Sequence, residues 1–183
     1  MKAIGFTHSL GIDETQSLFE FDVPDPVANG RDLLVDVKAV SVNPADAKRR
    51  IRTAVDTPHE APLVLGYDAV GVVAAVGSDV TNFAVGDEVW YAGDPTRSGS
   101  NAQRQLVDER VVGRKPKNLS WAEAAAMPLT GLTSFEMLFD RFCITEGSGK
   151  GKSLLVIGGA GGVGSLTIQL ARKLTDLTVI ATA

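Results

Sequence analysis

The chain of 183 residues carries 22 acidic and 18 basic side chains, which gives a net charge of −4 at pH 7. Hydrophobic residues make up 44% and charged residues 22%, as in globular rather than disordered proteins. Charges of both signs are interspersed, which excludes the basic footprint of a nucleic-acid-binding protein or a polybasic membrane surface. No segment approaches the roughly 18 apolar residues of a membrane span, so we expect a protein of the cytoplasm without a membrane partner.

Soft metal ligands are scarce in this sequence. Cys143 is the only cysteine, which excludes an intrachain disulfide and favours a reducing compartment. With a single cysteine, a four-cysteine zinc site is impossible, and His8 and His59 are the only histidines. A zinc site built from these three residues would need a coincidence of folding. We therefore predict no bound metal.

Short apolar or alternating segments separated by Gly and Pro follow one another through the first part of the chain. In the segment 33–42, Asp36 and Lys38 share one face, opposite Val35 and Val37, as in a half-buried strand. Several such strands with turn residues between them predict a small barrel or sandwich. The expected strands are 3–6, 17–22, 33–42, 70–76, 88–92 and 102–107.

Helical patterns begin at Ser120. Ser120 and Glu123 form a capping box, which predicts a helix that Pro128 ends. A buried strand at 153–157, a helix at 163–174 and a second strand at 177–183 are expected further on. A helix at 130–142 would carry an apolar stripe of Leu132, Phe135, Leu138, Phe139 and Phe142.

A glycine-rich turn links the expected strand 153–157 to the helix that follows. It fits the pattern G-x-G-x-x-G, which alone is weak because tight bends also use glycine. The strand before it and the helix after it supply the context of a dinucleotide-binding turn, where a pyrophosphate approaches main-chain amides at a helix N-terminus. The expected cofactor-binding residues are Gly159, Ala160, Gly161, Gly162, Val163 and Gly164.

The neighbouring tract 147–153 does not form a nucleoside-triphosphate loop. Glu146 stands where that motif requires glycine, and the tract precedes a strand instead of a helix. The cofactor is expected to be NADP(H), because an NAD site places an acid at the end of the second strand to bind the ribose hydroxyls. Residues 179–183 contain no acid, and Asp176 lies before that strand.

Residues 65–89 read LGYDAVGVVAAVGSDVTNFAVGDEV, and segments 42–46, 126–128 and 158–164 follow in order. Through these segments the sequence resembles the medium-chain dehydrogenase/reductase superfamily, in its zinc-free quinone-oxidoreductase-like branch. The resemblance covers the whole chain. That branch is often labelled zinc-type alcohol dehydrogenase-like.

The resemblance implies an α/β fold with a β-rich N-terminal part. A GroES-like β-barrel substrate domain would span residues 1–125. The first β-α-β unit of a doubly wound, NADP(H)-binding Rossmann domain would span residues 126–183. Since relatives continue for a hundred residues and more, we expect the chain to be truncated, and the full-length form to be a homodimer.

This chain departs from the zinc-dependent relatives, which place cysteine near Ser41–Asn43 and histidine where Tyr67 stands. Without a Lewis acid, alcohol oxidation is disfavoured, whereas hydride transfer from NADPH to a quinone or an α,β-unsaturated carbonyl needs only hydrogen-bond donors and a proton source. Two alternatives stay open: a catalytically incompetent fragment or scaffold, and, less favoured, a zinc-dependent alcohol dehydrogenase.

The resemblance also implies roles for single residues. Tyr67 would face the nicotinamide and orient or protonate the acceptor, unless it is a packed core tyrosine. Asn43 would line the nicotinamide side in a loop, or serve only as an Asn-Pro turn residue. Asp46 would hold that loop or pair with a base such as Lys48. Thr133 would lie near the carboxamide, or be a hydroxyl at a helix N-terminus.

Overall fold

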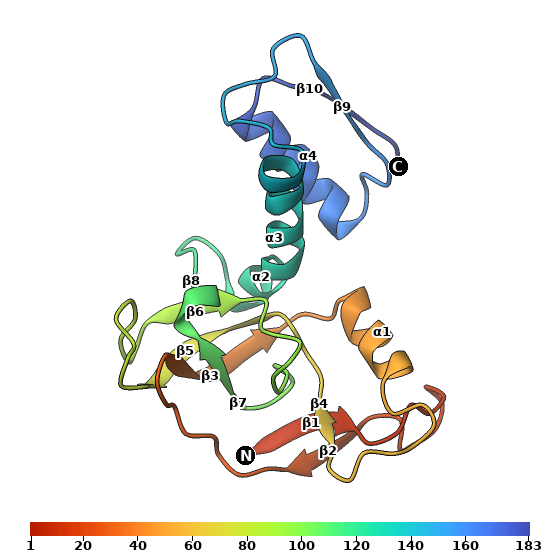
Figure 1. The fold of residues 1–183 in the computed structure, drawn as a ribbon, viewed down its shortest axis with the longest axis vertical. Helices are drawn as coiled ribbons and strands as arrows, with labels where there is room; N and C mark the ends of the chain where they lie inside the picture. Colours follow the sequence, from red (N-terminus) through yellow and green to blue (C-terminus); the bar gives the residue numbers. More distant parts are fainter. The chain divides into compact units, whose positions relative to one another are not determined.

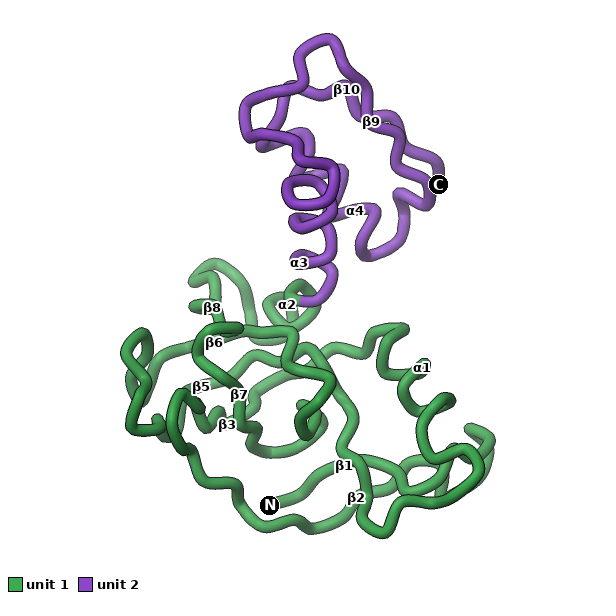
Figure 2. The backbone as a smooth tube through the Cα atoms, in the orientation of Figure 1, with its two compact units in different colours: residues 1–128 green, residues 129–183 purple.

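A computed structural model describes residues 1–183. The chain forms two compact units, residues 1–128 and residues 129–183, which Figure 2 colours separately. The domain boundary expected between residues 125 and 126 lies near this division and remains a prediction. None of the helices combines the length and apolar character needed to cross a membrane.

Unit 1 (residues 1–128) contains two antiparallel sheets, visible in the lower part of Figure 1. Its strands are β1 (Lys2–Phe6), β2 (Phe19–Asp22), β3 (Asp32–Val40), β4 (Leu63–Val64), β5 (Ala69–Val76), β6 (Glu88–Tyr91), β7 (Arg104–Asp108) and β8 (Gly113–Arg114). One sheet has the order β7-β3-β5-β6-β8 and the other the order β2-β1-β4. All six strands expected from the alternating pattern are present, with ends that differ by at most two residues.

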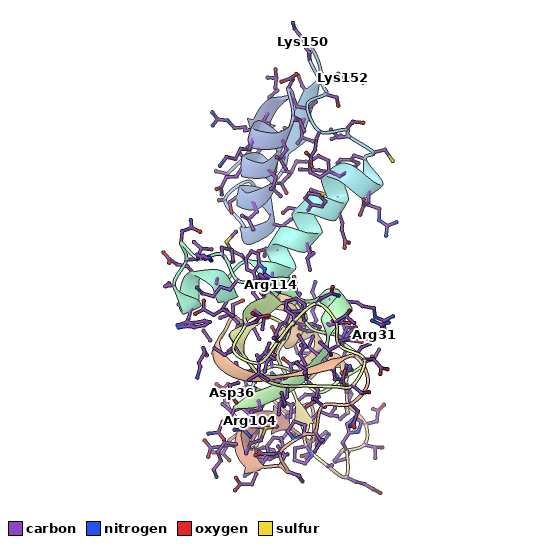
Figure 3. All side chains as sticks on the ribbon, turned by 90° about the vertical axis from the view of Figure 1, so that its left-hand side faces the viewer. Arg31, Asp36, Arg104, Arg114, Lys150 and Lys152 are labelled. Atoms are coloured by element: carbon purple, nitrogen blue, oxygen red, sulfur yellow. The ribbon has the colours of Figure 1, made fainter.

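The core of the larger sheet lies on the apolar face of β3. Val35 is fully buried, while Asp36 faces the other way and pairs across the sheet with Arg104 of β7. Arg104 Nε donates a hydrogen bond of 2.8 Å to Asp36 Oδ1, and the two side chains are labelled in Figure 3. The buried side chains of this core are Leu33, Val35, Ala69, Val73, Val89, Tyr91 and Val107.

Helix α1 (Pro44–Arg52) was not expected, because the Asn-Pro dipeptide was interpreted as part of a loop. Pro44 occupies the first helical position, where its fixed φ suits the helix and its missing N–H costs nothing. Asp46 lies in the first turn, and basic residues end the helix, as the helix dipole favours. The residues around Asn43 therefore begin a helix.

Two more helices follow in sequence. Helix α2 (Trp121–Ala125) starts with the predicted capping box: Glu123 Oε2 accepts a 2.9 Å hydrogen bond from the Ser120 backbone N–H. Pro128 does not merely end this helix; it is the first residue of α3 (Pro128–Glu136), which continues into the π-helical turn η2 (Met137–Arg141).

The apolar stripe expected on this helix is not a buried face in the structure. Of its members only Leu138 is buried, while Leu132, Phe135 and Phe142 are exposed. The pattern identified the helix but not its partners, because a stripe is buried only where another element covers it.

Unit 2 (residues 129–183) also contains β9 (Ser153–Val156), helix α4 (Gly162–Leu174) and β10 (Thr178–Ala181). β9 and β10 pair in parallel, and α4 connects them and packs against both, as Figure 1 shows. This is a β-α-β unit, so the predicted fold class is confirmed. The expectation that β9 is buried is wrong: only Val156 is buried, because a two-stranded parallel sheet lacks the flanking layers that bury such strands.

A fully buried carboxylate joins two distant segments of unit 1. Glu109, in the short helix η1 (Glu109–Val111), accepts hydrogen bonds of 2.9 Å and 3.0 Å from the backbone N–H groups of Asn82 and Thr81. The Arg31 guanidinium, labelled in Figure 3, donates a third at 3.0 Å. The two amides, together with Arg31, hold the pKa of the Glu109 carboxyl below its usual range.

Replacing this carboxylate tests its contribution to stability. Glu109→Gln should lower Tm by about 5 °C at pH 7, because an amide cannot accept all three hydrogen bonds. Since the folded-state pKa is depressed, the stabilisation is complete above the unfolded-state pKa of about 4.3 and is lost as the pH falls through the folded-state pKa. Melting curves of variant and wild type should therefore converge in acid. Glu20→Gln, at an exposed glutamate paired only with Lys2, is the control and should leave Tm nearly unchanged. Equal Tm values for the Glu109 and Glu20 variants would contradict the prediction.

Candidate functional site

A polar cluster in unit 1 is formed by residues that follow β3, precede β5 and precede β7. We call Ser41, Asn43, Asp68 and Ser100 the Asp68 cluster. The Asp68 side chain is fully buried, and its Oδ2 accepts hydrogen bonds of 2.8 Å from Ser41 Oγ and 2.8 Å from Asn43 Nδ2. Ser100 Oγ donates to the Asp68 backbone carbonyl at 3.0 Å. The cluster therefore fixes both the side chain and the backbone of Asp68.

The backbone before Asp68 requires glycine. Gly66 has φ of +108°, in the region that favours glycine, and a Cβ there would overlap Ser100 Oγ and the Asn101 backbone nitrogen. The Asn101 N–H donates to the Leu65 carbonyl at 2.8 Å, which ties the two segments together. This close approach places Tyr67 and Asp68 at a fixed junction between β4 and β5.

Asn43 is the N-cap residue of α1 and is 6% exposed. Its backbone N–H donates a 2.8 Å hydrogen bond to Asp46 Oδ2, so Asp46 closes the first turn of the helix. The ion pair expected between Asp46 and Lys48 is not formed, because the Asp46 carboxylate folds back over the N-cap. Asp46 Oδ1 is buried without a hydrogen-bond partner.

Tyr67 lies between Gly66 and Asp68 and is half-buried. Its hydroxyl makes no hydrogen bond within residues 1–183. Tyr91 also lacks a hydroxyl partner, but it is a core residue, and burial raises the pKa of its phenol far above the usual value. Of the two tyrosines, only Tyr67 can offer its hydroxyl to a small molecule.

Ser41 and Asp68 were not predicted as site residues; Ser41 was noted only because zinc-dependent relatives place a cysteine near it. An acid inside the apolar run 68–76 was the available signal, because a buried carboxylate must meet hydrogen-bond donors. The sequence could not show which donors these are, since Asn43 and Asp68 are 25 positions apart.

The glycine turn lies in unit 2 between β9 and α4. A Cβ on Gly164 would overlap the Gly158 carbonyl. The start of α4 can therefore pack against the glycine turn only because position 164 has no side chain. Gly161, the N-cap residue, is exposed, and a Cβ there would have no atom nearer than 3.5 Å. The first amides of α4 have no acceptor within the helix, and they suit an anionic group such as a diphosphate.

Thr133, Gly162 and the end of β10 are the other parts of the predicted cofactor site. Thr133 is exposed on α3, and its Oγ1 donates to the Leu129 carbonyl at 2.7 Å, so its lone pairs remain available as acceptors. Gly162 of the turn lies close to Thr130: a Cβ would stand 3.2 Å from Thr130 Cγ2. β10 ends without an acid, and Asp176 precedes the strand, with its N–H donating to the Ser148 carbonyl.

Potential metal ligands are not gathered anywhere in residues 1–183. No three side chains among the histidines, cysteine, aspartates and glutamates lie close enough together to hold a metal ion. In the Asp68 cluster the only carboxylate is surrounded by hydroxyl and amide groups, which are poor ligands for zinc.

The sequence is similar to that of known oxidoreductases. The alcohol dehydrogenase GroES-like domain matches residues 29–136. A zinc-type alcohol dehydrogenase-like protein of Staphylococcus epidermidis is 49% identical over 100% of this chain and 54% of its own length. A 2-methylene-furan-3-one reductase of Solanum lycopersicum is 41% identical over 99% of the chain and 46% of its own length. A chloroplastic NADPH-dependent alkenal/one oxidoreductase of Arabidopsis thaliana is 40% identical over 99% of the chain and 47% of its own length. The chain thus spans about half the length of these relatives.

Solved structures agree with these similarities. A candidate zinc-dependent alcohol dehydrogenase of Rhizobium etli has a TM-score of 0.91 and 52% identity, covering 100% of this chain and 53% of its own. The quinone oxidoreductase of Coxiella burnetii has a TM-score of 0.82 and 33% identity, and the match covers 100% of this chain and 56% of the Coxiella chain. A mycobacterial protein complexed with NADPH has a TM-score of 0.81 and 31% identity, and the match covers 100% of this chain and 53% of the mycobacterial chain. The chain belongs to the alcohol dehydrogenase GroES-like domain family and, with it, to the medium-chain dehydrogenase/reductase superfamily.

Proposed function

We propose that this chain forms the substrate domain and the beginning of the nucleotide domain of an NADPH-dependent oxidoreductase. The enzyme transfers hydride to a quinone or an α,β-unsaturated carbonyl without catalytic zinc. The observation that carries the proposal is the hydroxyl of the half-buried Tyr67, which makes no hydrogen bond within the chain, while the neighbouring residue Asp68 is fully buried and hydrogen-bonded to Asn43.

Tyr67 has the chemistry that reduction of a conjugated carbonyl requires. As hydride reaches the β-carbon, negative charge develops on the carbonyl oxygen, and a positioned hydroxyl stabilises that charge and can deliver the proton. Quinones depend less on this group, because their reduced oxygens take protons from water. The names of the Solanum and Arabidopsis relatives and of the Coxiella structure support these two acceptor classes.

The glycine turn supports NADPH as the cofactor. NADPH supplies the hydride when it is bound. The open backbone at Gly161 and the free amides at the start of α4 would hold its pyrophosphate, and Asn43 and Thr133 would contact the nicotinamide end. Residues 178–183, which form β10 and the two positions after it, contain no acid, and this favours the phosphorylated ribose. The mycobacterial complex with NADPH and the name of the Arabidopsis relative point the same way.

The lack of soft ligands supports a reaction without zinc. Ser41, Asn43 and Tyr67 occupy the positions where the resemblance expects cysteine and histidine, and Cys143 is exposed. We also propose, from the family resemblance, that the protein acts as a cytoplasmic homodimer.

Removing the Tyr67 hydroxyl tests the central residue. In the protein at its native length, Tyr67→Phe should lower kcat for enones on the order of 100-fold and for quinones only a few-fold, with NADPH affinity nearly unchanged. Steady-state kinetics with both substrate classes measures this. Tyr91→Phe removes an unpartnered core hydroxyl and is the matched control, with kcat expected at the wild-type value. Full enone activity in a normally melting Tyr67→Phe protein would make Tyr67 a packing residue.

Filling the glycine turn tests the cofactor site. Gly161→Val should weaken NADPH binding at least about tenfold, because the side chain would hold the pyrophosphate away from the amides, while the fold has room for it. Fluorescence titration should also show tighter binding of NADPH than of NADH to the wild type. Gly11→Val, at a position where a Cβ meets nothing closer than 3.9 Å, is the control. Unchanged affinity in the Gly161 variant would mean that the turn is only structural.

Metal analysis tests the zinc-free reaction. Purified protein should contain far less than one zinc per chain and keep its activity after dialysis against a chelator. Mass-spectrometric metal analysis alongside the enone and quinone assays gives both readings. One zinc per chain that activity requires would refute this part of the proposal.

A further inference from the structure

One oxygen of Asp68 receives hydrogen bonds from two residues of the segment after β3. Ser41 Oγ and Asn43 Nδ2 both lie 2.8 Å from Asp68 Oδ2. Because a carboxylate only accepts, the nitrogen of the Asn43 amide must face it, and the amide oxygen must point elsewhere. The contact therefore fixes which end of the Asn43 side chain is presented to its surroundings.

The same contact uses the donors of both residues. The Ser41 hydroxyl proton is directed to Asp68, and the second Asn43 amide proton has only a long 3.5 Å approach to Ser41 Oγ. Asn43 is held from a second side as well, since its backbone N–H donates to Asp46. With these groups turned inward, the half-buried Tyr67, one position before Asp68 in the sequence, carries a hydroxyl donor that makes no hydrogen bond within the chain.

We propose that Asp68 is a positioning residue that acts through Asn43. It holds the amide so that the Asn43 oxygen serves as an acceptor, and it leaves Tyr67 as the single donor for the substrate carbonyl. Without the carboxylate, the Asn43 amide can turn about its soft terminal torsion and offer its NH₂ group to the substrate, which then binds in a second, unreactive pose. This inference rests on the proposed enone and quinone reduction.

Glu109 shows what a purely structural carboxylate looks like in the same unit. It is equally buried, but two of its three donors are backbone amides. Asp68 Oδ2 instead accepts hydrogen bonds from the side chains of Ser41 and Asn43, which are groups that could otherwise bind a substrate. Glu109→Gln is therefore a matched control for the loss of a buried charge.

The kinetic test is a double-mutant cycle in the protein at its native length, assayed with an enone and NADPH. Asp68→Leu, which has no acceptor, and Asn43→Ala should each lower kcat about tenfold or more, with KM changed less than about threefold. The double variant should be no slower than the slower single variant, because both changes remove one effect. Glu109→Gln should keep kcat within about twofold below its melting temperature. A double variant whose loss is the product of the two single losses, or wild-type kcat in Asp68→Leu, would overturn the proposal.

A second measurement is independent of activity and of whether the Asp68 variant folds. By NMR, the side-chain NH₂ of Asn43 in the wild type should exchange with deuterium at least about tenfold more slowly than that of exposed Asn118. In a folded Asp68→Leu protein, where position 68 has no acceptor, this protection should disappear. If the wild type reduces neither enones nor quinones, the proposed function fails, while the exchange rates still decide whether Asp68 holds the amide. An unprotected Asn43 amide in the wild type would refute the inference.

Discussion

Unit 1 depends on hydrogen bonds that satisfy buried carboxylates. Removing a charged carboxyl group from water costs far more than one hydrogen bond returns, so several converging donors are needed to offset the full burial of such a group. Glu109 meets this requirement with backbone amides and Arg31, and it thereby fixes the loop after β5 to η1. Asp68 meets it with the side chains of Ser41 and Asn43. The first arrangement holds the framework, and the second sets the orientation of groups beside Tyr67.

Unit 2 is organised by close backbone approach instead of charge. Gly164 allows the first turn of α4 to lie against the Gly158 carbonyl, and Gly161 leaves the entrance of the helix open. The glycine turn therefore allows α4 to pack closely on one side and leaves room for an anionic ligand on the other. The sheet that carries the turn has two strands, and side chains such as Leu155 and Ile180 are exposed on it.

Local patterns in the sequence predicted most of the elements. Alternation along β3 and the capping box at Ser120 were sufficient, because each acts over a few residues. Helix α1 was missed although Pro44 and Asp46 are both favourable in a first helical turn, because the Asn-Pro dipeptide is equally typical of a loop. The burial of β9 was overestimated. An apolar run shows that a strand is suited to a buried position, but it does not show whether other elements cover the strand.

The candidate site was only partly predictable for a physical reason. Asn43 and Tyr67 were identified from the resemblance, but the contact that orients Asn43 joins two segments that approach only after β3 and β5 pair. The two tyrosines show the same limit. In sequence both are hydroxyl-bearing aromatics near the barrel strands, yet burial raises the pKa of Tyr91 and encloses its hydroxyl in the core. Tyr67 is only half-buried, and its hydroxyl makes no hydrogen bond within the chain. Tertiary burial, which no short motif encodes, thus separates the tyrosine suited to chemistry from the one that only packs.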